Sequence, residues 1–173
     1  MQLERMSESN STYFNKAFAL YEQAFPEIER RAIDEQNRIL SLSDYHFDLI
    51  FDDDGFVGIM LYWETPDFIF LEHFAIFPEF RNRQKGLNAL TLLKAKGKNI
   101  ILEIEPPIDE LTTRRYGFYR RNGFIMNDYF HIQAKYHYGD SDIELKLLSY
   151  PLEISESEYN TFESFIKKYV GIK

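Results

Sequence analysis

The stretch FIFLEHFAIFPEFRNRQKGLNAL, residues 68–90, decides how this chain folds. It begins as a strongly apolar strand pattern that runs to Pro78, continues as a basic turn containing Gly86, and becomes a helical pattern near Leu87. Backbone N–H groups in the first turn of a helix have no partner within the helix, and the helix dipole adds positive potential there. The pattern therefore predicts an anion site, and we expect a phosphate-bearing cofactor as its ligand.

The distribution of charge supports a specific anion. Six basic residues and no acidic residue lie in the turn and helix that follow the strand: Arg81, Arg83, Lys85, Lys94, Lys96 and Lys98. The chain carries a net charge of −8, so the remainder carries −14 once these six charges are removed. Such an acidic body would repel a polyanion, which argues against a nucleic-acid partner. A solvated basic helix face is the alternative interpretation.

Composition indicates a folded globular protein. With 173 residues, 45% of them hydrophobic, we expect one domain over residues 1–173 with a substantial core. Sixteen Phe and twelve Tyr predict that aromatic packing dominates this core. The absence of cysteine excludes disulfides, thiolate metal sites and cysteine nucleophiles. The polar N-terminus and the lack of a long apolar run predict a cytoplasmic protein with no membrane partner.

The remaining periodicities predict an α+β fold. Helical patterns cover residues 14–25 and 26–40, and Asp53–Asp54–Gly55 is a turn between strands at 46–51 and 55–63. After the strand at 68–77 we expect the following elements: a helix at 86–96, a strand at 99–105, a helix at 111–123, a hairpin of 130–138 and 142–150 around Gly139–Asp140, and an appended C-terminal helix at about 155–170. The predicted architecture is a central mixed, mostly antiparallel sheet of six to seven strands. It contains one parallel β-α-β crossover and is flanked by helices.

Three local signatures in this order resemble the GCN5-related N-acetyltransferase (GNAT) superfamily, over roughly residues 10–150. The first is Pro78–Glu79–Phe80–Arg81, the Gly turn and then Ala89–Leu90, which looks like the family's acetyl-CoA motif R/Q-x-x-G-x-G/A. The second is LEIEPP at 102–107, and the third is FYRRNGF at 118–124.

The chain departs from this motif in the pyrophosphate loop. With Arg81 as the first motif residue, Gln84 stands where the first Gly belongs and Gly86 is the second. With Arg83 first, Gly86 fits but Asn88 replaces the small residue. We prefer the Arg81 register, because it gives the usual spacing from Pro78 and puts Ala89–Leu90 and Leu93 towards the sheet. Gln84 keeps its backbone N–H, and we expect it to need a positive φ at some cost. Thr112 stands where relatives often carry Asn.

The resemblance implies an acetyl-CoA-dependent N-acetyltransferase in which a primary amine attacks the thioester directly, in a ternary complex. Its implied pyrophosphate cradle consists of backbone groups of Arg81, Asn82, Arg83, Gln84, Lys85, Gly86 and Leu87. The implied pantetheine edge is the strand segment Phe74, Ala75 and Ile76, left open if the neighbouring strand 99–105 splays away. No metal is implied.

The resemblance also implies an acid and a base. Tyr119 matches the family's tyrosine, which donates a proton to the leaving thiolate, although it could simply pack in an aromatic core. Glu72 and His73 interrupt an apolar strand; alternation puts them on opposite faces, with Glu72 sharing the face of Phe74 and Ile76. We favour Glu72 as the base over His73, while either could instead only hydrogen-bond within the sheet.

Other charged and histidine residues carry weaker hypotheses. Glu103 and Glu105 could bind the substrate cation, or pair with arginines of the following helix. The Asp52–Asp54 run is read as a turn and not as a metal site. His131 and His137 lack a third ligand for zinc, so structural or surface roles are expected for them.

Three functions remain open at this stage. The first is the N-acetyltransferase, with a small-molecule or protein amine as acceptor. The second is a non-catalytic acyl-CoA-binding or sensing domain on the same fold, and the third is an unrelated α/β binding module. In the family the acceptor is selected by the N-terminal helices, around Phe25–Arg31 here, and by the late hairpin. A monomer and a homodimer are both compatible with the sequence.

Overall fold

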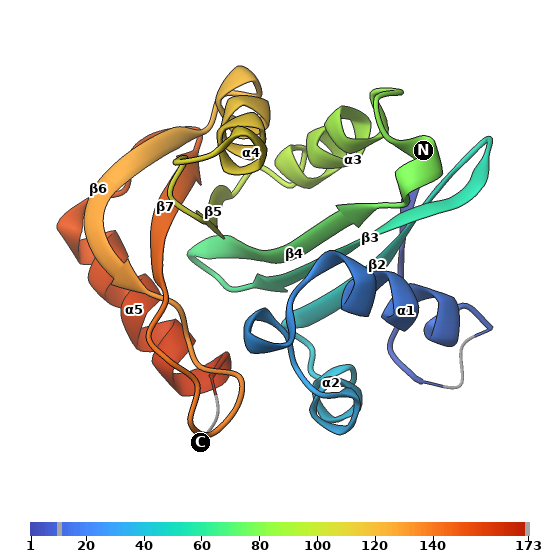
Figure 1. The fold of residues 1–173 in the computed structure, drawn as a ribbon, viewed down its shortest axis with the longest axis horizontal. Helices are drawn as coiled ribbons and strands as arrows, with labels where there is room; N and C mark the ends of the chain where they lie inside the picture. The colour runs from blue at the N-terminus through green and yellow to red at the C-terminus, as the bar shows by residue number, and fades with distance from the viewer. Residues whose placement is uncertain (10–11, 172–173) are drawn as a thin grey trace. The chain divides into compact units, whose positions relative to one another are not determined.

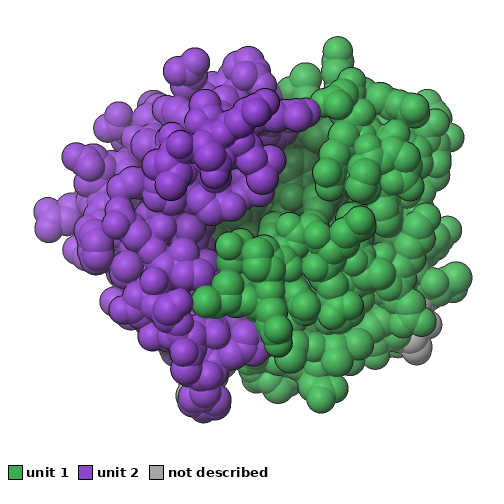
Figure 2. Space-filling model, in the orientation of Figure 1, with its two compact units in different colours: residues 1–98 green, residues 99–173 purple. Residues whose placement is uncertain are grey.

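The computed structural model describes residues 1–9 and 12–171. The chain forms two compact units, residues 1–98 and 99–173, which Figure 2 shows in green and purple. The expectation of a single domain over the whole chain stays a prediction.

The first unit contains four antiparallel strands in the order β1-β2-β3-β4. Figure 1 labels β2, β3 and β4. Their bounds are Gln2–Arg5 for β1, Tyr45–Asp52 for β2, Gly55–Glu64 for β3 and Phe68–Ile76 for β4. The predicted turn at Asp53–Asp54–Gly55 joins β2 to β3, and Gly55 takes a φ of 88° there. β1 was not predicted, because its four residues QLER show no apolar alternation and remain mostly exposed.

Helices cover both sides of these strands. α1 (Phe14–Ala24) packs on β3 and β4, followed by the 3-10 turn η1 (Glu27–Glu29) and by α2 (Ile33–Ile39). The 3-10 turn η2 (Pro78–Phe80) and α3 (Lys85–Lys94) follow β4, and Figure 1 shows α3 on the other side of the strands from α1. The prediction of one continuous helix over 26–40 is wrong, since the backbone is extended at Arg30 and Ala32.

Aromatic side chains fill the core of the first unit, as predicted. The largest fully buried side chains include Tyr21, Tyr45, Phe47, Trp63 and Phe70. The rings of Tyr45 and Trp63 are tilted against each other, with centroids 4.8 Å apart. Buried tyrosine and tryptophan side chains need hydrogen-bond partners, so this core contains a polar network as well as apolar contacts.

The second unit contains three antiparallel strands in the order β5-β7-β6. β5 is Asn99–Ile104, β6 is Ile125–Ile132 and β7 is Glu144–Tyr150, with α4 (Glu110–Arg121) packed on β5. α5 (Glu156–Tyr169) confirms the predicted C-terminal helix, and its Phe162 and Ile166 are buried. Both helices begin with a capping box, formed by Asp109 with Thr112 and by Ser155 with Glu158.

The predicted late hairpin is displaced. Its first strand was expected at 130–138, but β6 begins at Ile125 and ends at Ile132, so residues 133–143 form a long connection. Within this connection the His137 N–H donates to the Asp140 side chain over 2.8 Å, a local turn that competes with strand pairing.

The predicted fold class is confirmed. The sheet is a mixed and mostly antiparallel arrangement with one parallel pair and flanking helices.

Candidate functional site

The loop between β4 and α3 has an unusual backbone. Asn82 and Gln84 have φ values of 62° and 58°, so two residues without the freedom of glycine adopt the left-handed region. Gln84 is also the N-cap of α3, and its side chain makes no capping hydrogen bond. The expectation that Gln84 needs a positive φ is therefore confirmed.

This loop presents backbone donors. The first turn of α3 contains no acidic residue, and its earliest intrahelical bond runs from the Asn88 N–H to the Gln84 carbonyl over 3.0 Å. The N–H groups of Lys85, Gly86 and Leu87 precede that bond and stand at the positive end of the helix dipole. Left-handed residues beside right-handed ones form a concave array of N–H groups, which is an arrangement that binds anions.

We predict that Gln84→Gly raises the free energy of unfolding by about 1 kcal/mol, because a left-handed conformation costs an L-residue roughly that much. Denaturant unfolding measures the change. Arg83→Gly is the matched control, since Arg83 is not among the positive-φ residues and should lose stability. Equal losses for both variants would contradict the strained conformation.

The positive charges around the loop have acidic partners. Lys85 Nζ lies 2.6 Å from Oδ2 of both Asp52 and Asp54 at the β2–β3 turn, and these hydrogen bonds raise the pKa of Lys85. Arg81 Nε donates to the Ile76 carbonyl over 3.0 Å. The predicted cationic island is therefore partly neutralised by the acidic turn, which lies about thirty positions earlier in the chain.

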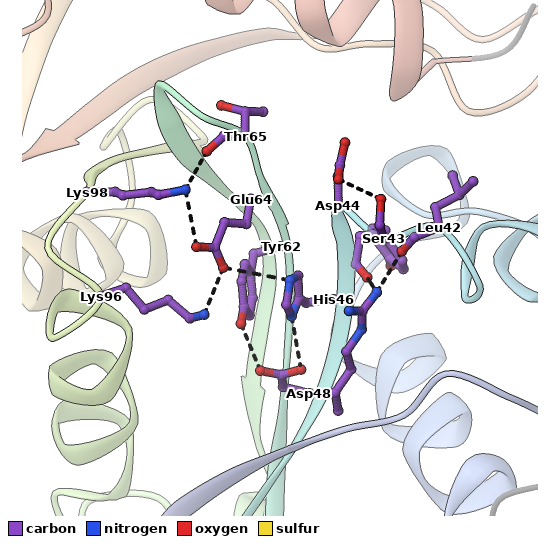
Figure 3. Close-up of polar contacts among 12 residues, drawn as sticks. Leu42, Ser43, Asp44, His46, Asp48, Tyr62, Glu64, Thr65, Lys96 and Lys98 are labelled. Carbon is purple, nitrogen blue, oxygen red and sulfur yellow. Dashed lines mark hydrogen bonds and ion pairs between the residues drawn. The ribbon is translucent and has the colours of Figure 1, made fainter.

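Two further lysines of the island pair with Glu64 at the end of β3 (Figure 3). Lys96 Nζ lies 2.7 Å from Glu64 Oε2, and Lys98 Nζ lies 3.3 Å from Glu64 Oε1. The same carboxylate faces His46, whose ring stacks on Tyr62 at 4.4 Å. Anion binding at the loop must therefore rely on backbone groups more than on the sum of the lysine charges.

β4 leads into this loop and is interrupted at Glu72. Leu71 pairs with Tyr62 and His73 pairs with Leu61, which leaves Glu72 as an extra residue, a β-bulge. Both Glu72 and His73 contact the segment that follows α1, Glu72 through Arg31 and His73 through the Glu29 carbonyl. The prediction that Glu72 and His73 lie on opposite faces is wrong, because it assumed unbroken alternation along the strand. The prediction that Glu72 shares a face with Phe74 and Ile76 rested on the same assumption.

Glu72 forms a buried ion pair. Its Oε1 lies 2.7 Å from Arg31 Nη1, and each side chain is only 1% exposed. Trp63 Nε1 donates to Glu72 Oε2 over 3.1 Å, and the Arg31 guanidinium lies over the rings of Tyr45 and Trp63. The Arg31 N–H donates to the Tyr21 hydroxyl over 2.9 Å. Each oxygen of the predicted base thus already holds a protein donor.

His73 is held as a neutral imidazole. Burial lowers its pKa to about 4, and its Nε2 lies 2.7 Å from the Glu29 carbonyl oxygen, which can only accept. Its ring meets Tyr21 and Phe25 edge-on at 4.8 and 4.6 Å. His73 therefore fastens η1 to β4.

We predict that Glu72→Met and Arg31→Met each lower the free energy of unfolding by about 3–5 kcal/mol, because each leaves a buried charge without its partner. The double variant Arg31→Met/Glu72→Met should lose far less than the sum. Denaturant unfolding of the four proteins forms a double-mutant cycle. Single-variant losses below about 1 kcal/mol that simply add up in the double variant would mean a weak, surface-like pair.

The last residues of β4 match the predicted pantetheine edge in one respect. Phe74, Ala75 and Ile76 pair with β3 on one side only within the first unit. Glu72 as a whole is half-buried although its side chain is 1% exposed, so its exposed surface belongs to the main chain. Gly58, opposite Ile76, allows β3 and β4 to approach closely, since a Cβ at position 58 would collide with the Ala75 carbonyl oxygen.

In the second unit, Tyr119 lies on α4 within an aromatic cluster. It is 9% exposed and its ring packs on Phe118 and Phe124 at 5.2 and 5.4 Å. Burial raises the pKa of Tyr119 to about 12, so the phenol keeps its proton at neutral pH. Core packing, the alternative reading for Tyr119, describes its surroundings, and its role as the general acid stays a prediction.

Other predicted residues of this unit have partners within it. Glu105 pairs with Arg115 on α4. Pairing with an arginine of the following helix was the alternative to substrate binding for this residue. Glu103 pairs with His131 instead of an arginine. The Thr112 hydroxyl belongs to the capping box with Asp109, over 2.8 Å.

Among residues 1–9 and 12–171, no cluster of three or more His, Cys, Asp or Glu side chains is arranged to hold a metal ion. In the same part of the chain no helix has the length and apolar character needed to cross a bilayer.

Known proteins that resemble this chain are assigned as acetyltransferases. No family model matches the chain. YjbC of Bacillus subtilis strain 168, a protein assigned as an acetyltransferase, is 34% identical over 80 residues; the match covers 44% of this chain and 41% of YjbC. A solved structure of a protein from Bacteroides thetaiotaomicron, assigned to the GNAT family, superposes with a TM-score of 0.92 at 28% identity and covers 100% of both chains.

A third comparison is with a structure that contains coenzyme A. An aminoglycoside 6'-N-acetyltransferase solved with coenzyme A has a TM-score of 0.65 at 13% identity, covering 90% of this chain and 100% of that one, a likeness of fold alone. The fold is that of GNAT-family acetyltransferases, and these comparisons support the same class for this chain.

Proposed function

We propose that this protein is an acetyl-CoA-dependent N-acetyltransferase, in which a primary amine attacks the thioester directly in a ternary complex. The observation that carries the proposal is the loop before α3. Two non-glycine residues hold left-handed conformations there, at the start of a helix whose first N–H groups lack a side-chain cap. Strain of this kind is maintained where a backbone array serves a site.

In this proposal, backbone groups of the loop bind the pyrophosphate of acetyl-CoA. The N–H groups of Lys85, Gly86 and Leu87 supply donors, whereas the Arg81 N–H already donates to the Pro78 carbonyl over 3.2 Å. The side chains of Arg81 and Lys85 hold the loop through the Ile76 carbonyl and the Asp52–Asp54 turn. The main chain of Phe74–Ile76 bonds the pantetheine amides. Solved GNAT-fold proteins with coenzyme A or acetyl-CoA support the choice of cosubstrate.

Tyr119 is the proposed general acid. Attack of a neutral amine on the thioester forms a C–N bond and breaks the C–S bond, and the departing thiolate then needs a proton. A phenol whose pKa lies near 12 is fully protonated at neutral pH and can supply it.

Glu72 is the proposed acceptor of the ammonium proton, and it can act only through a relay. Its side chain is 1% exposed, so an amine cannot contact it directly. A carboxylate has four lone-pair positions, and the donors from Arg31 and Trp63 leave some of them for a water. The neutral His73, already donating to a carbonyl, is the weaker candidate.

A second function follows from the same ion pair. Because Arg31 and Trp63 occupy both oxygens of Glu72, a non-catalytic acyl-CoA-binding or sensing domain is the alternative. Under either function the acceptor class, the monomeric or homodimeric state and the cytoplasmic location stay predictions.

We predict that Tyr119→Phe lowers kcat by about 10²-fold or more, the usual contribution of a general acid, with little change in acetyl-CoA affinity. Release of free CoA thiol across a panel of small and peptidyl primary amines measures it. Tyr116→Phe is the matched control on α4, one turn earlier. Unchanged turnover in Tyr119→Phe would refute the acid, and no thiol release with any amine would favour the binding domain.

A further inference from the structure

His131 occupies an unusual position in the second unit. Its side chain is fully buried on β6, with Nδ1 2.7 Å from Glu163 Oε1 of α5. Its Nε2 meets Glu103 Oε1 of β5 in a shorter hydrogen bond. One imidazole on β6 therefore joins β5, which lies on the far side of β7, and the C-terminal helix α5.

The number of donors fixes the protonation state. An ionised carboxylate can only accept hydrogen bonds, and a neutral imidazole has a single N–H to donate. Two carboxylates facing both ring nitrogens need two donors, which only the imidazolium provides. A carboxylate at each ring nitrogen therefore favours a positive charge on His131.

The surrounding charges balance in this state. Lys167 Nζ lies 2.9 Å from Glu163 Oε2, so two carboxylates face one ammonium and one imidazolium. From α5, the Tyr159 ring lies 6.5 Å from the imidazole, and its hydroxyl donates to the Phe130 carbonyl. The β7 neighbour of His131 is the apolar Leu145. Loss of the imidazole proton would leave one uncompensated negative charge in a largely buried cluster.

We propose that His131 is a buried imidazolium that latches α5 onto β5 and β6, so that alkaline pH loosens the C-terminal helix. This latch is independent of the acetyltransferase proposal. It adds ionic contacts to a helix whose Phe162 and Ile166 side chains are already buried by apolar packing.

The direction of the pH effect follows from the two carboxylates. Burial acts to lower the pKa of His131, but the hydrogen bonds and charges of Glu103 and Glu163 outweigh it and raise that pKa above its usual 6.5. A raised folded-state pKa means that the stabilisation is complete below about pH 6.5 and is lost as the pH rises through the folded value. The helix should therefore be tightest in mild acid and loosen on the alkaline side.

The direct test is an NMR titration of the imidazole nitrogens in the intact protein. At pH 7.5 we expect two protonated nitrogens on His131, and Glu103→Gln should shift its titration to lower pH. His137, outside the cluster, is the internal reference. A single neutral tautomer of His131 at pH 7 would overturn the proposal.

Hydrogen exchange then measures the latch itself. Between about pH 6 and pH 9, below the titration of lysine and tyrosine, we expect the protection factors of α5 amides, corrected for intrinsic rates, to fall about tenfold while those of β3 stay constant. In His131→Gln, protection of α5 should be lower and independent of pH. Constant protection in the wild type would also overturn the proposal; the wild-type measurements decide the matter if His131→Gln fails to fold.

Discussion

The first unit depends on one buried ion pair, Arg31 with Glu72. Two charges at 1% exposure can persist only if each is the other's partner and further donors complete the site. The bulge in β4 makes this possible, because the extra residue turns Glu72 to the side where His73 also lies. Segment 29–31 is thereby fastened to β4 at two successive residues, and α2 begins only at Ile33, after this anchor.

From that anchor, β4 runs directly into the candidate cofactor loop. The strand fixes the position of Pro78 and η2, and the loop then turns into α3 through two left-handed residues. Lysine side chains contribute less positive potential than the sequence suggests, because Asp52, Asp54 and Glu64 hold three of them. This site therefore shares its backbone geometry with a glycine-containing loop. That geometry tolerates variation of the side chains.

Features set by local periodicity were predictable from the sequence. The strand–turn–helix from 68 to 96, the appended helix α5 and the positive φ of Gln84 all follow from short-range patterns and motif spacing. Features set by distant partners were not. Neither the bulge at Glu72 nor the Arg31 contact leaves a local signal, since the paired residues lie about forty positions apart. The Glu103–His131–Glu163 cluster draws on three separate elements for the same reason.

The two units show the same chemical strategy in different places. In each, a charged group is buried beside partners of opposite charge and joins elements that are distant in sequence: Arg31 with Glu72, and His131 with two glutamates. These clusters specify which segments meet, while aromatic and aliphatic burial supplies most of the stability.

Calorimetric titration of the purified protein with acetyl-CoA tests most directly whether the β4–α3 loop is a cofactor site. Saturable binding of one acetyl-CoA per chain is expected, with a Kd in the range of about 1 μM to 1 mM that enzymes show for their substrates. No binding at millimolar acetyl-CoA would contradict both the acetyltransferase and the acyl-CoA sensor, and would leave the loop as a strained connection without a ligand.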